Sequence, residues 1–571
     1  MIGRRSDQVP LFDVGNVFDV KLDPASFHGQ LALVAPALFK DEAFATFYAE
    51  KMGRPTVPPS LLALTTILQH EAGVSDEEAV NRTAFDLRWA AVLHKEAGEP
   101  LCAKSTLQLF RGHLVLHPEV QAIFDASIEE ARRAGLLKPK PLRAVIDTKP
   151  IRGRGAVQDT FNLLATGIRR LAQALGKHQK RNAKDVLQAT GLDRYVEPSL
   201  KGSADIDWDD EAAKSALLSQ VVADANRLLD LAAGGDGSVD AAAELLRSLL
   251  LQDIEVISTP ESGEQARVKD GTAKSRVPSA TDPEMRHGRK SASKRFNGHK
   301  ADVVVDEESQ TVVAFEVLAG DAPDCAKALD LVKQAEQNTG LNVQETTGDC
   351  AYGAASTRDA FAAEGRDLQA KVAQASSPKG MFPKSAFAIN VARGTAQCPA
   401  GQTTTKLHAS ADGGKTFEFG ACCSDCPLRA QCTTSARGRS LALHRQEAQL
   451  QEARAYQRSA QGRQRLRRRV VVEHRLARLG QLGIGQSRYF GRAKTRFQLM
   501  MACSVANLRW AWNWEARARA DMTTLAAHLP ALSALRWLIR PLLERVSHFP
   551  VLTTALRNPR LGGRWARRAA A

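Results

Sequence analysis

The chain has 571 residues, 44% of them hydrophobic, so it is long enough for several domains and too apolar for a disordered protein. Its 78 Lys and Arg outnumber its 63 Asp and Glu, giving a net charge of +15 that favours a polyanionic partner. The polar start lacks a signal-peptide pattern, and no stretch reaches the roughly 18–20 apolar residues of a membrane span. Nine cysteines in so long a chain do not form the disulfide framework of a secreted protein. We therefore expect a cytoplasmic protein without a membrane segment.

Helices are predicted throughout residues 20–135. Residues 58–68 combine helical apolar spacing with a Pro-Pro-Ser start, Ser75 and Glu78 form a capping-box pattern, and another helix start lies at 104–106. A compact helical module with basic residues can bind DNA. It can equally be a packing or dimerisation unit, and composition alone does not decide between them.

A short buried strand is predicted over 142–146, ending at Asp147. The pattern is then helical from 161 to 255, with a glycine-rich break at 234–237. Residues 258–295 are polar and rich in Gly, Ser and Lys, and we interpret them as an exposed loop.

A mixed α/β core is predicted further along the chain, with helical material inserted after its first strand. The pattern predicts, in order, a hairpin of 301–306 and 311–317, a helix at 323–337, a strand at 342–347, a helix at 355–363 and a strand at 367–372.

Three carboxylates are candidate metal ligands: Asp147, Asp349 and Glu473. The two aspartates follow predicted strands, where α/β folds expose functional side chains, and the glutamate lies in an arginine-rich helix. Converging oxygen ligands hold Mg²⁺ or Mn²⁺, and two such ions about 4 Å apart can activate an attacking oxygen and stabilise a leaving one. Acids after strands are also common turn residues, so position alone does not settle the role. Rival ligands that the residues alone do not exclude are Asp302, Asp306 and Glu316.

Arginine is concentrated in two segments. Residues 437–475 contain 11 arginines against three acids, and residues 536–571 contain eight against one. The guanidinium fork suits phosphate, so we interpret these segments as binding nucleic acid. A solvated helix face or a basic tail is the alternative.

Single cations near the three acids are candidate DNA contacts. Arg465 and Arg469 precede Glu473 by eight and four residues, which predicts one helix face, although an ordinary surface ion pair is the alternative. Lys300, near the hairpin, is a candidate phosphate contact or part of a solvated strand edge. Three further cations directly follow Asp147: Lys149, Arg152 and Arg154.

Cysteines cluster between residues 398 and 432. Cys423 and Cys426 form a Cys-x₂-Cys pair, and Cys398 and Cys432 complete four candidate thiolates for a structural Zn²⁺. A group of reduced cysteines is the alternative, and Cys422 can replace Cys423. Thiolates suit Zn²⁺ whereas Mg²⁺ needs oxygen, so the two sites would not compete.

Trp510, Trp512 and Trp514 alternate near the end of a predicted helix. Tryptophan can stack on bases. A spacing of two does not favour one helix face, so core packing or a helix end is the preferred interpretation.

Several short motifs in a fixed order carry a family resemblance. The stretches are 52–55, 85–89, 146–148, 155–164, 281–284, 296–300, 348–353, 472–474 and 506–509. In this order they resemble bacterial insertion-sequence transposases with an Asp-Asp-Glu triad. The likeness is to the large type, with an N-terminal helical transposase domain and a Cys-rich insertion before the catalytic glutamate. The residues after Glu473 depart from the family pattern, because Arg475-Leu476 stands where Phe-Gly is frequent.

The resemblance implies a ribonuclease-H-like catalytic core in which Asp147, Asp349 and Glu473 are catalytic and bind Mg²⁺ (or Mn²⁺), in preference to the rival acids. The implied domains are a helical N-terminal domain at 1–138, the core at 139–160, 281–375 and 445–515, a helical insertion at 161–280, a Cys-rich insertion at 376–444 and a basic tail at 516–571.

The implied activity is DNA cleavage at element ends followed by strand transfer into target DNA. The implied partners are the terminal inverted repeats, target DNA and further copies of the chain in a synaptic complex, at the bacterial nucleoid. Two alternatives remain open: a related nuclease without strand transfer, and a zinc-containing DNA-binding protein with an inactive catalytic core.

Overall fold

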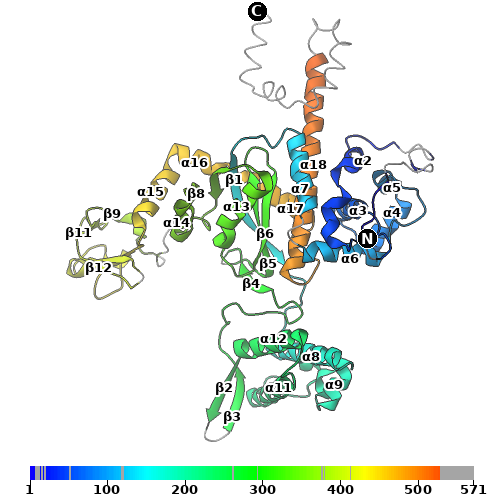
Figure 1. The fold of residues 1–571 in the computed structure, drawn as a ribbon. Helices are drawn as coiled ribbons and strands as arrows, with labels where there is room; N and C mark the ends of the chain where they lie inside the picture. Colours follow the sequence, from blue (N-terminus) through cyan, green and yellow to red (C-terminus); the bar gives the residue numbers. More distant parts are fainter. Residues whose placement is uncertain are drawn as a thin grey trace, which may run out of the picture.

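The computed structural model describes residues 1–6, 13–14, 17, 21–50, 53–117, 121–259, 263–291, 293–373, 377, 380–411 and 413–527. A central sheet lies between N-terminal helices on one side and the Cys-rich part on the other, while a separate helical unit lies beyond the end of the sheet near β4 (Figure 1). The arginine-rich segment at 536–571 lies outside the described residues.

The N-terminal part is helical, as the sequence predicts. Ser75 caps its helix by accepting a hydrogen bond from the Glu78 backbone N–H, at 3.2 Å, which confirms the predicted helix start. The elements are α2 (Phe27–Leu38), η1 (Asp41–Phe47), α3 (Pro59–Ala72), α4 (Asp76–Phe85), α5 (Leu87–Leu93), α6 (Lys104–Leu116) and α7 (Ala122–Arg133).

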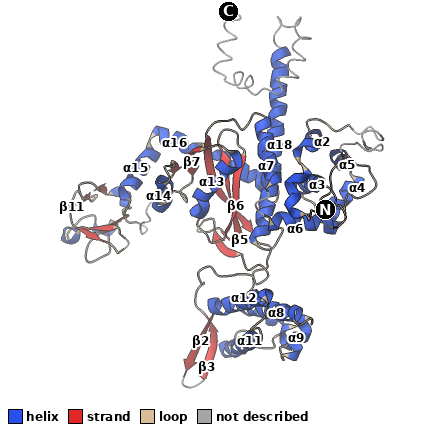
Figure 2. Cartoon of the chain, in the orientation of Figure 1, coloured by secondary structure: helices blue, strands red, loops and turns tan. Residues whose placement is uncertain are grey.

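The central sheet has six strands in the order β4-β5-β1-β7-β8, with β6 also paired to β5. β1 runs antiparallel to β5 and parallel to β7, and β7 is parallel to β8, so the sheet is mixed (Figure 2). The strands are β1 (Leu142–Arg152), β4 (Arg286–Arg289), β5 (Arg295–Asp306), β6 (Val312–Ala319), β7 (Val343–Gly348) and β8 (Leu368–Ala370).

β1 is longer than predicted and does not end at Asp147. It continues to Arg152 because β5 pairs with it as far as Gly298, and Asp147 lies opposite Val303 in that ladder. The local sequence Thr-Lys-Pro gives no strand signal, so this extension comes from pairing with a strand about 150 residues away. Asp147 therefore lies inside the sheet.

The prediction of an exposed loop over 258–295 is wrong in part. β2 (Ile254–Thr259) and β3 (Gly263–Val268) form a hairpin, and β4 adds to the central sheet. Ser279, Asp282 and Met285 are buried, because this segment packs against Gly153 and Gly155 after β1. The polar composition of the segment gave no indication of this burial.

The helical insertion forms a unit with its own hydrophobic core, as its apolar periodicity indicates. Within it, the fully buried Tyr195 donates its hydroxyl to Asp224 at 2.9 Å. The main helices are α8 (Thr160–His178), α9 (Ala183–Ala189), α11 (Glu211–Leu231) and α12 (Gly237–Asp253), joined through η2 (Asp193–Tyr195) and α10 (Leu200–Ser203).

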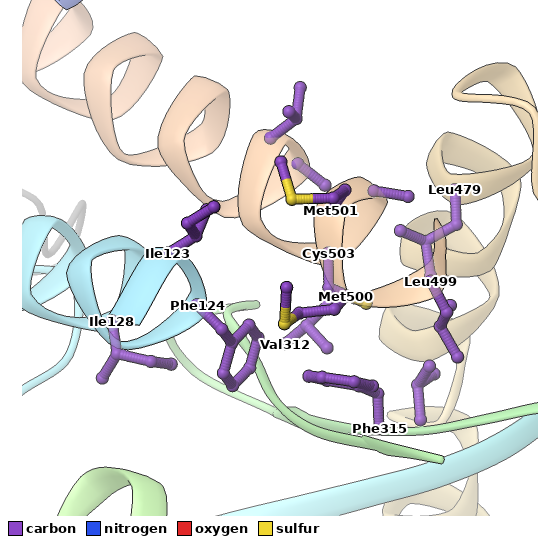
Figure 3. Packing of buried hydrophobic residues seen from close by; sticks show 14 of the residues in the cluster. Ile123, Phe124, Ile128, Val312, Phe315, Leu479, Leu499, Met500, Met501 and Cys503 are labelled. Atoms are coloured by element: carbon purple, nitrogen blue, oxygen red, sulfur yellow. The ribbon is translucent and has the colours of Figure 1, made fainter. Parts of the chain in front are cut away.

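A single hydrophobic core joins the N-terminal helices, the sheet and the C-terminal helices. Phe124 of α7 and Phe315 of β6 meet edge to face, with ring centroids 4.9 Å apart. Met500 and Met501 of α18 (Arg492–Ala527) lie beside them, and Leu479 of α17 (Val470–Gln481) lies close by (Figure 3). η3 (Asp324–Lys327) and α13 (Ala328–Thr339) pack against β5 and β6, and α14 (Ala355–Ala363) follows β7.

α18 runs past residue 515, so the predicted tail beginning at 516 starts within a helix. Trp512 is 2% exposed and donates to Glu130 at 3.1 Å, and Trp510 donates to the Ser309 carbonyl at 2.8 Å. Core packing of these tryptophans is thereby confirmed.

The Cys-rich part consists of two small three-stranded sheets around a compact apolar cluster that includes Phe417 and Cys432. Its elements are η4 (Lys384–Ala386), β9 (Ala388–Asn390), β10 (Thr395–Gln397), β11 (Thr403–Thr404), β12 (Leu407–Ala409), β13 (Lys415–Glu418), η5 (Gly420–Cys423), η6 (Arg429–Gln431) and β14 (Ser440–Leu443). α15 (Glu447–Arg458) and α16 (Ala460–Arg467) lead from it back to α17.

Candidate active site

Asp147 is held in the middle of β1 with its side chain 15% exposed. Its Oδ1 accepts a hydrogen bond from the Thr148 backbone N–H at 2.8 Å, and its Oδ2 accepts one from Arg469 at 2.8 Å. Because β1 is bordered by paired strands on both sides, the position of this carboxylate is set by the sheet itself.

Asp349 follows the last residue of β7, the strand parallel to β1. Its Oδ1 accepts a hydrogen bond from the Ala351 backbone N–H at 2.8 Å. Val145 lies opposite Thr347 in the β1–β7 ladder, so a continuation by two residues along each strand places Asp147 beside Asp349 on one face.

Gly353 allows the turn after Asp349 to pack against β8. A Cβ atom there would lie 1.9 Å from the Lys371 carbonyl oxygen, so only glycine fits.

Glu473 lies in the first turn of α17, with its side chain 50% exposed. Arg469, four residues earlier, donates to Glu473 Oε1 and at the same time to Asp147 Oδ2. One guanidinium group thus joins the first and third carboxylates, although sequence spacing predicted only a local pair.

Arg465 does not share this face. The helical run breaks between α16 and α17 at Arg468 and Arg469, and Arg465 pairs instead with Glu345 of β7. The prediction of one continuous helix face through Glu473 is therefore wrong. Arg465 braces α16 against the sheet rather than facing open space.

The three carboxylates are electrostatically coupled. The pKa of Asp147 is raised to about 6, chiefly by burial and in smaller part by the negative charges of Asp349 and Glu473, against the opposing effects of the Thr148 N–H and Arg469. Like charges raise a carboxyl pKa only when they are close. Asp349 and Glu473, although far from Asp147 in sequence, therefore lie in its neighbourhood.

The donor set of this site has the chemistry that Mg²⁺ prefers, since all three groups are carboxylates. Across the described parts of the chain, however, no group of three or more His, Cys, Asp or Glu side chains is arranged to hold a metal ion. In this arrangement Arg469 lies between Asp147 and Glu473 and neutralises both.

The rival acids have structural partners. Asp302 is fully buried on β5 and accepts a hydrogen bond from Tyr352, and Asp306 accepts one from the Ser309 backbone N–H at 2.8 Å. Glu316 pairs with Arg496 at 3.3 Å. These contacts favour structural roles over metal binding for all three acids.

The candidate DNA-contacting cations fall into two groups. Lys300 is 8% exposed and donates to Asp324 and to the Ala322 carbonyl, each at 2.6 Å, so its interpretation as a phosphate contact is not supported. Arg152 and Arg154 are exposed, and Lys149 is half-buried beside Gly480 of α17. These three cations follow Asp147 along β1 and just beyond it, and Arg154 donates to the Arg488 carbonyl at 3.1 Å.

Five cysteines line one small pocket in the Cys-rich part: Cys398, Cys422, Cys423, Cys426 and Cys432. Thiols are a donor set suited to Zn²⁺. All five are free cysteines, however. Among the described residues, they are not arranged as a group that could hold a metal ion. Cys422 and Cys423, which are alternative candidates for one of the four zinc ligands, both lie at this pocket.

Two family models match the chain. One, described as "Transposase DDE domain", matches residues 397–512, a range that includes Glu473 and the five clustered cysteines but neither aspartate. The other, described as "Transposase domain (DUF772)", matches residues 18–113 in the N-terminal helices. Neither a curated protein nor a solved structure gives a significant match.

The class defined by the matched segments is the transposases. More particularly, the two matches support a DDE insertion-sequence transposase, the family that the sequence resembles. Members of this class act on DNA, and they generally use a divalent metal such as Mg²⁺. Within the described residues, no helix is both long and apolar enough to cross a membrane.

Sequence reasoning missed two features of the site. One is the double contact of Arg469, which needs the fold to be seen because Asp147 is 322 residues away. The other is the partnership of Tyr352 with Asp302, 50 residues apart. A tyrosine three residues after Asp349 was visible in the motif, but no local pattern indicates its partner.

Proposed function

We propose that this transposase cleaves DNA at the ends of its element and joins the freed 3′ ends to target DNA. The observation that carries the proposal is geometric: Asp147 on β1 lies beside the end of β7, where Asp349 follows, and Arg469 joins Asp147 to Glu473. The family matches support the DNA substrate, and the carboxylates supply the chemistry.

In this proposal Asp147, Asp349 and Glu473 hold the divalent metal. When bound, Mg²⁺ would activate the attacking oxygen and stabilise the leaving oxygen of the phosphodiester. Asp147 lies within β1 and Asp349 is held by the turn that follows β7, whereas Glu473 is half-exposed in the first turn of α17. Arg469 orients Asp147 and Glu473 through its two hydrogen bonds.

DNA phosphates would contact Lys149, Arg152 and Arg154, which lie along β1 and just after it. Base contacts elsewhere would select the terminal inverted repeats. Joining two element ends requires two sites, so we propose a dimer or larger assembly acting on nucleoid DNA in the cytoplasm.

The proposed catalytic core is ribonuclease-H-like and comprises 139–160, 281–375 and 445–515. The mixed sheet with β1 central, flanked by antiparallel β5 and parallel β7, is compatible with that fold. Residues 1–138, 161–280 and 376–444 would be the helical domain, the helical insertion and the Cys-rich insertion.

A structural Zn²⁺ held by Cys398, Cys423, Cys426 and Cys432 belongs to the same proposal. Its support is the gathering of these thiols, with Cys422, at one pocket. Zinc there would stabilise the Cys-rich part, whose apolar cluster is small.

Strand transfer is tested with pre-cleaved duplexes that carry the inverted repeats flanking the coding region, mixed with supercoiled plasmid and Mg²⁺. We expect joined products from the unaltered protein and none from Asp147→Asn, with end binding nearly unchanged. In a parallel reaction with uncleaved end duplexes, cleavage without joined products would instead identify a nuclease without strand transfer, and binding without either would identify an inactive DNA-binding protein.

A further inference from the structure

A buried tyrosine–aspartate pair lies directly behind the candidate active site. Tyr352 and Asp302 are both 0% exposed, and the Tyr352 hydroxyl donates to Asp302 Oδ1 at 2.9 Å. Asp302 Oδ2 has no hydrogen-bond partner in this arrangement. Neither residue belongs to the proposed metal ligands.

Tyr352 is tied to the turn that carries Asp349. Its backbone N–H donates to the Asp349 carbonyl at 3.3 Å, and its side chain packs beneath Gly348, where a Cβ atom would lie 2.8 Å from that of Tyr352. The ring is therefore packed against Gly348, the residue that precedes Asp349.

Asp302 is anchored on the opposite side of β1. It lies on β5 opposite Thr148 in the ladder, so its side chain points to the face away from Asp147. The sheet order is β5-β1-β7, and Tyr352 follows β7. The Tyr352–Asp302 hydrogen bond thus passes behind β1, the strand of Asp147, and joins the two elements that flank it.

A buried tyrosine–aspartate pair costs more free energy than a core needs for stability alone. Burying a carboxyl group with one oxygen unpartnered costs more than burying an apolar pair of similar volume. What the hydroxyl–carboxyl contact adds over an apolar contact is direction, since a hydrogen bond fixes the relative position of two groups.

We propose that Tyr352 and Asp302 are positioning residues that hold the Asp349 turn in register with Asp147. The expected effect of this pair on metal binding rests on the proposed function. The position of the turn itself does not depend on that function.

The test uses the full-length protein with Tyr352→Phe, which removes only the hydroxyl, and Asp302→Asn, which keeps an acceptor oxygen for Tyr352. The matched control is Tyr195→Phe, because Tyr195 is also fully buried and donates to an aspartate, but in the separate core of the helical insertion. If the two Tyr→Phe variants lose a similar amount of melting temperature, any further difference between them does not come from global stability.

The first measurement is amide hydrogen exchange of residues 346–353. Tyr352→Phe should exchange faster there than the unaltered protein, while Tyr195→Phe and Asp302→Asn should not. Unchanged exchange in Tyr352→Phe would overturn the proposal, whatever the protein does to DNA. Faster exchange in a protein that lacks metal-dependent cleavage would refute the proposed function and leave the positioning role standing.

The second measurement is Mn²⁺ binding to the same proteins, followed by electron paramagnetic resonance. Removing a partner that orients a metal ligand typically weakens binding about 10–100-fold, so we expect about tenfold weaker binding in Tyr352→Phe and a change within about twofold in Asp302→Asn. Loss of binding in Asp302→Asn with unchanged exchange would make Asp302 a metal ligand and contradict the proposal.

Discussion

Asp147 is the residue on which the candidate site depends most, because it is bonded to Arg469 and coupled to both other acids. Its burial within β1 favours the protonated form of the carboxyl group. The same residue that the proposed chemistry needs as a carboxylate is therefore held in surroundings that oppose its charge. A positive partner is needed to offset this, and in this arrangement Arg469 supplies it.

The raised pKa of Asp147 predicts a pH-dependent stability of the metal-free protein. A folded-state pKa of about 6, above the ordinary 3.8, means that the folded protein binds this proton more tightly than the unfolded chain. The resulting stabilisation is complete below about pH 4 and is lost as the pH rises through about 6, by up to about 3 kcal/mol.

Asp147→Asn stays neutral, so its melting temperature between pH 4 and pH 7 should fall less than that of the unaltered protein, as measured by calorimetry without divalent metal. Parallel pH profiles for Asp147→Asn and the unaltered protein would contradict the assignment.

At the scale of elements, the turn between β7 and α14 sets the position of Asp349. Gly353→Ala would place a methyl group against the Lys371 backbone carbonyl, which cannot move as a side chain can. We expect a melting temperature lowered by several degrees and a large loss of end cleavage, with end binding retained. Gly112→Ala is the control, because nothing lies within 4 Å of that position in α6, and alanine there should stabilise by up to about 1 kcal/mol.

Asn507 of α18 holds the beginning of edge strand β6. Its side chain accepts from the Val312 N–H at 2.9 Å and donates to the Val312 carbonyl at 2.9 Å and to Ser127 of α7 at 3.2 Å. Asn507→Ala leaves these buried groups unpaired, so we expect a loss of about 2–4 kcal/mol. Thermal unfolding measures it against Asn513→Ala, an exposed position on the same helix. Equal melting temperatures for the two variants would refute this role.

The elements could be predicted from sequence wherever local periodicity determined them. The N-terminal helices, α11, α14 and the β5–β6 hairpin follow their apolar spacing and caps. The length of β1, the burial of residues 277–285 and the break before α17 could not be predicted, because each depends on contacts with residues far away in sequence. For the same reason the triad could be named from its motifs, whereas the Arg469 bridge and the Tyr352–Asp302 pair could not.

At the scale of the whole molecule, separate cores divide the chain. The N-terminal helices share one core with the sheet and α18, whereas the helical insertion and the Cys-rich part each have their own. The helices that match the transposase domain at 18–113 thus share a hydrophobic core with the central sheet.

The Cys-rich part provides a prediction on metal content. The purified protein should contain about one zinc per chain by elemental analysis, and Cys423→Ser or Cys426→Ser should lower that content and the melting temperature. Cys350→Ser, an exposed cysteine outside the cluster, should change neither. A zinc-free protein with an unchanged fold would show that the gathered thiols are reduced cysteines only.

The central claim is that Asp147, Asp349 and Glu473 together perform the DNA chemistry. The most direct test is Mg²⁺-dependent cleavage of a duplex bearing the element end by Asp147→Asn, Asp349→Asn and Glu473→Gln, with the rival acid changed in Glu316→Gln as the matched control. We predict that each triad variant loses cleavage by about 10³-fold or more while binding the end, and that Glu316→Gln cleaves almost normally. Normal cleavage by any one of the three triad variants would contradict the account.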